Sequence, residues 1–542
     1  MHWVAGEPPF RWRWGALLDH SSRLSDCLSE AGLRAGHVCA LIFRHHKYFY
    51  PIYLAVAALG AIPAVLAYPN NRLHPDKFRA GLEGMSRRSG LDWVLTEHEL
   101  EDGIVPLLTR RGSTVRGILF PLDWAEGSNR GGSNWSHPRS SPDGPCLLQH
   151  SSGTTGLQKA VVLSHRAILE HVHRYGAAID LRLGDKIVSW LPLYHDMGLI
   201  AAFYLPLTLG IPLIQLDPFE WVSAPLILLD AISKEAATLS WLPNFAYNLM
   251  ADRIREDDVA DIRLDTIRMF INCSEPVRAD SHEKFYQRFR SLGLKREALA
   301  ACYAMAETTF AVTQTAPGVE ARQLVIDREQ LARNHIAPAK SPTSVRRCVS
   351  SGAPISGCEI KIFDESGVDL SEDRVGEIGI RSASLFDGYR NNPQKTAEVL
   401  VDGWYLSGDY GFRHQDELYI IGRKKDMLIV AGKNIYPEDI EDALGRLAGV
   451  LPGRVVAFGL EDETSGTEQI CVIAETALDR VLERRQLRFA IMRAGMEIDV
   501  TISRVYLAPP RWLIKSSAGK PSRQANKERA MGVLTYSDGG PR

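Results

Sequence analysis

The chain has 542 residues, a formal net charge of −2 and eight cysteines, none of them in a CxxC pair. Its length exceeds what one hydrophobic core usually supports, so at least two domains are expected. The balance of 45% apolar to 24% charged residues excludes a disordered chain, and the small net charge excludes a whole-molecule attraction to nucleic acid or anionic membrane. The scattered cysteines predict neither a zinc site nor a disulfide framework and suit a reducing, cytoplasmic setting.

The first half of the chain alternates helical periodicity with short aliphatic runs. Residues 14–32 have the spacing of an amphipathic helix, whereas "VCALIF" (38–43) and "IPAVLAY" (62–68) are typical of buried strands. Similar runs recur up to about residue 274. The pattern predicts an α/β fold with a large, doubly wound and mostly parallel sheet.

One apolar run, residues 51–69, is long enough to suggest a membrane span. Gly60, Pro63 and Pro69 interrupt it. We therefore interpret the run as a buried helix followed by a buried parallel strand, because such strands are apolar on both faces.

Composition and predicted elements change at three further places along the chain. Residues 124–145 are rich in Gly, Ser, Pro and Asn and predict an exposed loop. From about residue 351 short strands alternate with turns, and after residue 424 the charge density rises. We predict a large N-terminal domain over residues 1–423 and a small, mobile α+β C-terminal domain over residues 424–542.

The stretch "HSSGTTGLQKAVV" (150–162) combines hydroxyl groups, glycines and one lysine. Backbone N–H groups at the glycines, the hydroxyls and an ammonium group are what a phosphate requires. The spacing does not match GxxxxGK[ST], which disfavours a P-loop NTPase. A polar surface loop remains the alternative. The candidate phosphate-binding residues are Ser151, Ser152, Gly153, Thr154, Thr155, Gly156 and Lys159.

Taken in order, this stretch and five later motifs resemble the adenylate-forming superfamily of acyl-CoA synthetases, fatty-acyl-AMP ligases, luciferases and peptide-synthetase adenylation domains. The five motifs are "LPLYHDMGL" (191–199), "NCSEPV" (272–277), "CYAMAETT" (302–309), "GWYLSGDYG" with "GRKKDMLIVAGKNIYPEDIE" (403–441), and "SSAGKPSR" (516–523). Each motif is weak alone, but their shared order over most of the chain is specific. A fainter resemblance, to acyl-CoA ligases of platensimycin-type diterpenoid pathways, is carried by no particular motif.

The resemblance implies a role for each matching residue. Asp409 and Arg423 would hold the ribose of ATP or AMP, and Glu307 with Thr154 would hold Mg²⁺ through hard oxygen atoms. Lys520 would stabilise the charge that develops on the α-phosphate. His195 would border the substrate carboxylate, although a core histidine is the alternative. The remaining implied positions are Ser274, Glu275, Pro276, Tyr303, Ala304 and Thr308 at the nucleotide, Gly432 beside a pantetheine arm, and Lys425 as the hinge.

The acid and the thiol acceptor are less well defined. "WLPLYHDMGLI" and "WLPNFAYNLM" resemble ligases of long acyl chains. Apolar or core-forming side chains that could line the acyl pocket are Phe203, Leu207, Trp241, Asn244, Phe245, Ala246 and Leu249. We expect a lipophilic carboxylic acid that passes through acyl-AMP to CoA. The alternative is a fatty-acyl-AMP ligase that loads the phosphopantetheine of an acyl carrier protein, because residues 318–347 are longer than in many CoA ligases and could impede the rotation that CoA needs.

Several positions depart from the superfamily pattern. Gln158 and Ala160 stand where Pro and Gly are common, Ala304 where Gly is usual, and Pro521 where an aliphatic residue is usual. These changes crowd the ATP end and suggest the further alternative of an enzyme that only thioesterifies a preformed acyl-AMP. A non-catalytic adenylate-binding paralogue is disfavoured because Lys159, Glu307, Asp409 and Lys520 are all retained, and a luciferase-like oxygenase is remote.

Overall fold

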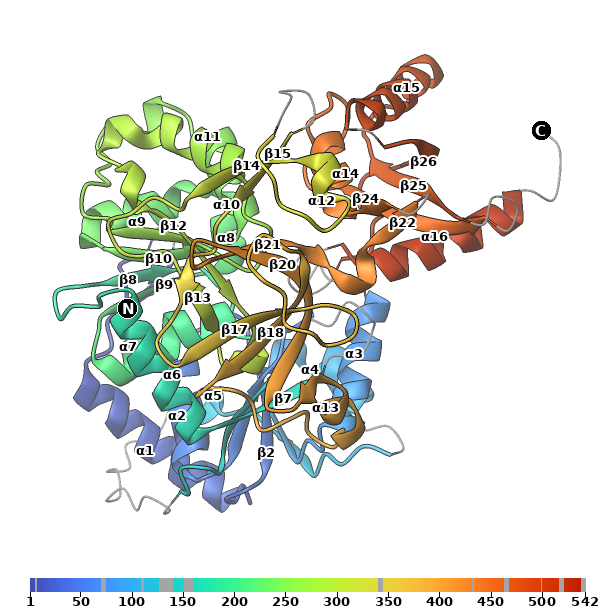
Figure 1. Ribbon diagram of the computed structural model, residues 1–542. Coiled ribbons are helices and arrows are strands. Elements are labelled where there is room, and N and C mark those ends of the chain that lie inside the picture. Colours follow the sequence, from blue (N-terminus) through green and yellow to red (C-terminus); the bar gives the residue numbers. More distant parts are fainter. Residues whose placement is uncertain are drawn as a thin grey trace.

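The computed structural model of the chain describes residues 1–4, 7–69, 75–108, 112–125, 140–150, 159–339, 345–430, 433–462, 467–498, 500–515 and 521–537 (Figure 1). Two mostly parallel sheets with helices around them make up the first two thirds of the chain, and a smaller α+β part follows. The predicted fold class is therefore confirmed.

The larger sheet has eight strands within the described residues. Its strands are parallel from β1 to β12, and β13 and β16 continue it antiparallel. In spatial order they are β1 (His2–Trp3), β9 (Leu213–Leu216), β8 (Ile187–Ser189), β10 (Leu239–Leu242), β11 (Met269–Asn272), β12 (Leu299–Ala304), β13 (Ala311–Gln314) and β16 (Ala353–Pro354).

The second parallel sheet contains the apolar run of residues 51–69. The order of its strands is β3 (Ile62–Val65), β2 (Val38–Ile42), β4 (Trp93–Thr96) and β5 (Gly117–Leu119). The run forms helix α2 (Phe49–Ala58) and then β3, every residue of which is buried. Among the described helices, none combines the length and hydropathy needed to cross a bilayer. The interpretation as a buried helix and strand is confirmed.

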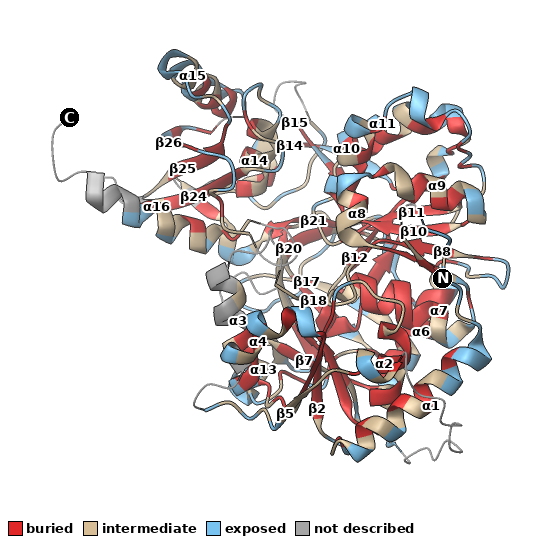
Figure 2. Ribbon diagram, turned by 180° about the vertical axis from the view of Figure 1, so that it is seen from behind, coloured by how far each residue is buried: buried red, intermediate tan, exposed pale blue. Residues whose placement is uncertain are grey.

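Helices pack against the sheets and enclose a large core, and a separate apolar cluster lies on the second sheet around Ala40, Ala64 and Val94. Figure 2 shows buried ribbon in both sheets. Local sequence explains several helix starts: the Ser164 hydroxyl accepts a hydrogen bond from the Ala167 amide at the start of α6, and Asp217 caps α8 through the amides of Phe219 and Glu220. The helices are α1 (Trp14–Glu30), α3 (Pro75–Arg88), α4 (Glu101–Leu108), α5 (Leu122–Ala125), α6 (His165–Ala178), α7 (Leu205–Leu209), α8 (Pro218–Ser223), α9 (Leu226–Glu235), α10 (Asn244–Arg253), α11 (Ala279–Phe289), α12 (Arg328–Leu331) and α13 (Pro393–Val399).

Antiparallel strands complete the N-terminal part (residues 1–423). The hairpin of β6 (Pro145–His150) and β7 (Ala160–Ser164) flanks residues 151–158, and β14 (Gln323–Asp327) pairs with β15 (Val345–Val349). A further sheet, as expected from the short strands after residue 351, contains β17 (Cys358–Phe363), β18 (Gly376–Ser382), β20 (Trp404–His414), β19 (Leu400–Val401) and β21 (Glu417–Arg423). Residues 126–139 of the predicted exposed loop lie outside the described residues.

The C-terminal part (residues 424–537) has apolar clusters of its own, separate from the main core. It begins directly after β21 with a short turn, Lys424–Asp426, so a domain boundary at residue 423 remains our prediction. Its elements are β22 (Leu428–Val430), β23 (Lys433–Ile435), α14 (Pro437–Gly445), β24 (Val455–Asp462), β25 (Thr467–Glu475), α15 (Val481–Glu497), β26 (Ile502–Ala508) and α16 (Arg523–Ser537).

A buried cation joins the two ends of this C-terminal part. Arg523, at the first turn of α16, pairs with Asp426 in the initial turn and with Glu438 and Glu441 of α14, the last two at 3.2 and 3.0 Å. Burial raises the pKa of Glu441 to about 7, against the opposing effect of Arg523. One guanidinium therefore ties the chain that follows Lys520 to the chain that follows the predicted hinge.

Replacing Arg523 with Met should destabilise the C-terminal part by about 3–5 kcal/mol, because three carboxylates would remain buried around an apolar side chain. Between pH 4.5 and about 7, Glu441 is protonated in the folded state but ionised in the unfolded state, where its pKa is near the ordinary 4.5. Its contribution to stability therefore falls as pH rises from about 4.5 to 7. Without Arg523 the pKa of Glu441 in the folded state rises further. Calorimetry should therefore find that the variant loses more melting temperature, relative to wild type, at pH 8 than at pH 5. Arg255→Met, which breaks an exposed pair with Asp258, is the control and should leave the melting temperature unchanged; equal behaviour of the two variants would contradict the prediction.

Candidate active site

The clearest feature is a carboxylate shared by two sheets. Asp409 of β20 lies directly opposite Arg423 of β21 in the antiparallel register, and their charged groups are 3.5 Å apart. Tyr303, from β12 in the large sheet, donates its hydroxyl hydrogen to Asp409 Oδ2 at 2.6 Å. Burial and the nearby carboxylate raise the pKa of Tyr303, so its hydroxyl remains a donor. The structure thus brings together three residues that the sequence placed at the nucleotide.

A second acid–base pair lies in the same region. Glu307 is buried in the turn Ala306–Thr308 and accepts a hydrogen bond from the Tyr389 hydroxyl at 2.8 Å. The Lys159 ammonium group sits over the ring of Tyr389, 4.6 Å from its centroid. Burial raises the pKa of Glu307 and lowers that of Lys159, and each charge opposes the shift of the other. A cation beside Glu307 would favour its ionised carboxylate, and a phosphate beside Lys159 would favour its charged ammonium group.

Electrostatic interactions link these two groups into one site. The charge of Arg423 repels that of Lys159. Lys425, the predicted hinge, is repelled by Lys159 and attracted by Asp409. Burial, followed by the charge of Arg423, lowers the pKa of Lys425. Residues far apart in the sequence therefore share one charged region.

Tyr389 is a site residue that the sequence analysis missed. Its segment pairs with β7, because Val161 bridges to Tyr389 and the Arg390 amide donates to the Ala160 carbonyl. No periodicity or motif of the surrounding sequence signals this contact. It arises only because the two segments meet in the fold.

The turn that carries Glu307 has a strained backbone. Thr309, a β-branched residue, has φ of +69°. The turn is held by the Thr309 hydroxyl, which donates to the Ser384 carbonyl at 2.8 Å, and by the Phe386 amide, which donates to the Glu307 carbonyl. The Thr308 hydroxyl donates to the carbonyls of Met305 and Phe310, so it supports this turn from within. Ala304, the residue after Tyr303, lies at a register shift between β12 and β13.

The segment of His195 has unusual helical geometry. His195 is half-buried and lies two residues before a π-helix, Met197–Tyr204, whose first amide is capped by Asp196. Gly198 is required there, since a Cβ atom at this position would lie 2.2 Å from the Pro192 carbonyl oxygen. The glycine of the motif "HDMGL" is the sequence feature from which this close packing could have been predicted.

The loop of Ser274, Glu275 and Pro276 lies against α10 and the π-helix. Glu275 accepts a hydrogen bond from the Phe245 amide at 2.9 Å, and the Ser274 hydroxyl is 3.7 Å from the Met197 sulfur. Ser274 has φ of +68°, a second strained position, and Pro276 is exposed. Glu275 thus supports the first turn of α10.

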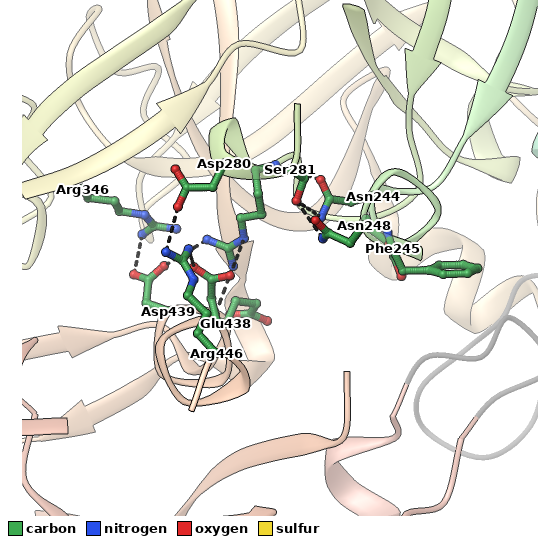
Figure 3. A network of polar contacts seen from close by, with 12 residues as sticks. Asn244, Phe245, Asn248, Asp280, Ser281, Arg346, Glu438, Asp439 and Arg446 are labelled. Carbon is green, nitrogen blue, oxygen red and sulfur yellow. Dashed lines mark hydrogen bonds and ion pairs between the residues drawn. The ribbon is translucent and has the colours of Figure 1, made fainter. Parts of the chain in front are cut away.

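Three of the predicted acyl-pocket side chains are buried and packed among other core residues. Phe203 is buried against Tyr50 and Tyr53, and Trp241 is fully buried and donates to the Tyr175 hydroxyl. Both the nitrogen and the oxygen of the Asn244 side-chain amide are hydrogen-bonded inside the protein. Nδ2 donates to Ser281 (Figure 3), and Oδ1 accepts from the Asn272 side chain and the Arg278 amide. The core alternative therefore describes these residues better, because partners distant in sequence surround them.

The other pocket candidates are more accessible. Leu207 and Leu249 are half-buried and Ala246 is buried, whereas Phe245 is 39% exposed. Phe245 lies edge-on to the stacked indoles of Trp190 and Trp221, whose centroids are 3.6 Å apart.

Several predicted residues lie outside the described residues: Ser151, Ser152, Gly153, Thr154, Thr155, Gly156, Gln158, Gly432 and Lys520. The chain on either side of two of these segments is well defined. Strands β6 and β7 hold residues 150 and 160 opposite each other, and Lys515 forms an antiparallel bridge to Pro521. Ala160 packs in an apolar cluster with Leu148, so its methyl group is accommodated in the core.

Ion pairs hold the C-terminal part against the N-terminal part beside this site. Figure 3 shows Arg346 with Asp439 of α14, at 3.0 Å, and Asp280 with Arg446, at 2.7 Å. Arg278 also donates to the Glu438 carbonyl. These contacts orient the C-terminal part in the observed arrangement.

The Tyr303→Phe variant should bind AMP about three- to tenfold more weakly, because Asp409 loses the charge-assisted hydrogen bond that fixes one of its oxygens. Isothermal titration calorimetry with AMP measures the effect. Tyr286→Phe, on α11 with its ring under Arg296, is the matched control. Equal AMP affinity of both variants would show that the Tyr303 hydroxyl does not position Asp409.

Comparison with known proteins agrees with this geometry. The profile of the AMP-binding enzyme family matches residues 3–390. The chain is 32% identical to the medium-chain-fatty-acid–[acyl-carrier-protein] ligase JamA of Moorena producens (strain JHB), over 72% of this chain and 68% of JamA. It is 26% identical to the long-chain-fatty-acid–AMP ligase FadD26 of Mycobacterium bovis (strain ATCC BAA-935 / AF2122/97), over 95% of this chain and 91% of FadD26.

A solved structure from a study of fatty acyl-adenylate ligases from E. coli and L. pneumophila superposes with a TM-score of 0.89 at 27% identity, covering 97% of this chain and 94% of that one. Its match extends through both parts of the chain. The motif order, the shared carboxylate site and these similarities agree, and the chain belongs to the AMP-binding enzyme family, within the adenylate-forming superfamily.

Proposed function

We propose that the protein activates a lipophilic carboxylic acid in two steps. The carboxylate first attacks the α-phosphate of ATP to form acyl-AMP and release pyrophosphate. A thiol then attacks the acyl carbonyl, and a thioester, AMP and a proton are released. The observation that carries the proposal is the convergence of Asp409, Arg423 and Tyr303 with Glu307 and Lys159 in one charged region.

Each residue has a chemical task in this scheme. Asp409 accepts hydrogen bonds from the ribose hydroxyls through Oδ1, because Oδ2 already accepts from Tyr303, and Arg423, 3.5 Å from Oδ1, donates to the same sugar. Lys159 attracts the phosphates. Glu307 fits a magnesium ion, because it offers carboxylate oxygens in a buried place where a cation would offset the rise in pKa that burial causes. Such an ion, held with Thr154, would neutralise phosphate charge. Lys520 would approach the α-phosphate, and Gly432 would leave room for the thiol-bearing arm.

Departures from the superfamily pattern raised the alternative of an enzyme that only uses preformed acyl-AMP. The methyl group of Ala160 packs in an apolar cluster, which weakens the argument that it crowds the phosphate loop. Pyrophosphate release from ATP and a fatty acid decides between the two possibilities, and its absence would favour the thioesterification-only enzyme.

For the thiol acceptor, we propose the phosphopantetheine of a carrier protein in preference to CoA. The connection over residues 318–347 contacts both parts of the chain. Asn334 accepts a hydrogen bond from Asn434 at 3.0 Å, and Leu331 packs in one apolar cluster with Tyr436. These contacts would resist the rotation that CoA transfer needs. The relative JamA is named as an [acyl-carrier-protein] ligase, which supports the same acceptor.

The Lys520→Ala variant should reduce pyrophosphate release by about a hundredfold or more, the usual effect of removing one donor to a transition-state charge. Transfer from synthetic acyl-AMP to a thiol should stay near the wild-type rate, because Lys520 acts on the phosphate and not on the acyl carbonyl. Lys515→Ala, at the other end of the same loop, is the control for general disturbance of the segment. If both half reactions of the Lys520 variant fell together, the assigned role would be wrong.

Replacing residues 328–344 with an Asn-Gly turn should increase CoA thioester formation about tenfold or more, because Asp327 and Val345 already pair as hairpin neighbours and the contacts to the C-terminal part would be lost. Mass spectrometry of acyl-CoA measures the gain, and unchanged pyrophosphate release shows an intact site. Asn334→Ala keeps the full length and should give only a small gain. High CoA activity of the wild-type protein would contradict the proposed preference.

A further inference from the structure

Helix α15 presents apolar side chains to solvent. Leu482, Phe489 and Met496 are 73%, 60% and 64% exposed, and Val481 at the start of the helix is 81% exposed. The first three are spaced seven residues apart, so they form one stripe along the helix. The opposite face, with Leu487, Ile491 and Ala494, packs into the core of the C-terminal part. Figures 1 and 2 show α15 at the outer edge of the C-terminal part, with its outward face exposed.

Arginines border this stripe. The Arg485 guanidinium lies 5.7 Å from the centre of the Phe489 ring, and the exposed Arg488 lies one residue before the same phenylalanine. Neither makes an ion pair with a carboxylate among the described residues. The helix carries four arginines and two glutamates, although the whole chain has a net charge of −2. Positive charge is therefore concentrated beside the apolar stripe.

Such a surface requires an explanation. Single apolar side chains on a surface are ordinary, but a continuous stripe with a charged border is typical of a binding site. A second copy of the chain is a poor occupant, because a two-fold interface would bring the same arginine-bordered patch, with its positive charge, against itself.

We propose that the stripe of Leu482, Phe489 and Met496, with Arg485 and Arg488, docks an acidic amphipathic helix of the carrier protein that supplies the thiol. This inference rests on the proposed function and names the surface where the acceptor binds. The arginines select an acidic partner and speed the encounter, and the apolar stripe supplies the buried centre of the interface. Since α15 belongs to the same part as the Lys520 segment, a bound carrier protein moves with the part that rotates.

The test compares a protein thiol with a small thiol. Acyl transfer from synthetic acyl-AMP is measured with a recombinant holo acyl carrier protein and, separately, with pantetheine, which lacks a protein surface. The variants are Leu482→Ser/Phe489→Ser/Met496→Ser and Arg485→Glu/Arg488→Glu. The matched control is Leu169→Ser/Leu183→Ser, which removes leucines that are 48% and 91% exposed on the N-terminal part.

Both α15 variants should raise KM for the carrier protein about tenfold or more, the size of effect expected from losing a cluster of central interface side chains. Transfer to pantetheine and pyrophosphate release should stay within about twofold of wild type, as should every rate of the control. The wild-type KM for the carrier protein should rise with salt, and that of the charge-reversed variant should rise much less.

Four results would overturn the inference. The first is that the α15 variants leave KM for the carrier protein unchanged. The second is that they impair transfer to pantetheine as much as transfer to the carrier protein, which would mean that the stripe packs on the N-terminal part during catalysis. The third is sedimentation of the wild type, but not the variants, with vesicles of phosphatidylglycerol and phosphatidylcholine. The fourth is a dimer that only the wild type forms. Failure of the proposed function looks different, because wild type would then release no pyrophosphate and acylate neither thiol.

Discussion

The site depends on one shared carboxylate. Asp409 accepts a hydrogen bond from Tyr303 of the large sheet and faces Arg423 across the β20–β21 pair. Arg423 is also the last residue of β21, immediately before the C-terminal part begins. The large sheet, the smaller antiparallel sheet and the start of the C-terminal part therefore meet at one charge. Because tyrosine and arginine already compensate that charge, the carboxylate is held in one orientation by its two partners.

The forces inside the C-terminal part differ from the forces that hold it to the rest of the chain. Arg523 is largely buried among three carboxylates, so breaking this cluster leaves uncompensated charge inside the protein. The pair of Arg446 and Asp280 is exposed, and water can replace such a contact at little cost. Other contacts between the two parts are less easily broken, because Arg346 and Asp439 form a largely buried pair and Leu331 packs in one apolar cluster with Tyr436.

The residues around the nucleotide site adopt local conformations that they would avoid in isolation. Thr309 and Ser274 have positive φ angles, and a π-helix follows His195. Each is stabilised by contacts with distant segments, such as the hydrogen bond from Thr309 to Ser384. Strain of this kind concentrates at functional sites because the surrounding fold can hold a side chain where catalysis needs it.

The sequence by itself determined the fold class, the buried helix and strand within residues 51–69, and the order of motifs that carry Asp409, Arg423, Glu307 and Lys159. Local periodicity contains the information on the fold class and on the helix and strand, whereas the motifs are identified by their resemblance to the adenylate-forming superfamily. Only the tertiary structure decided that Tyr389 joins Glu307 to Lys159, and that the Trp241 and Asn244 side chains serve the core. It also decided which side of α15 faces solvent. Leu487 and Ile491 on one side are as apolar as Leu482 and Phe489 on the other, so the helix sequence gives two candidate core faces. Burial depends on which distant segments pack against a side chain, and no local pattern encodes that.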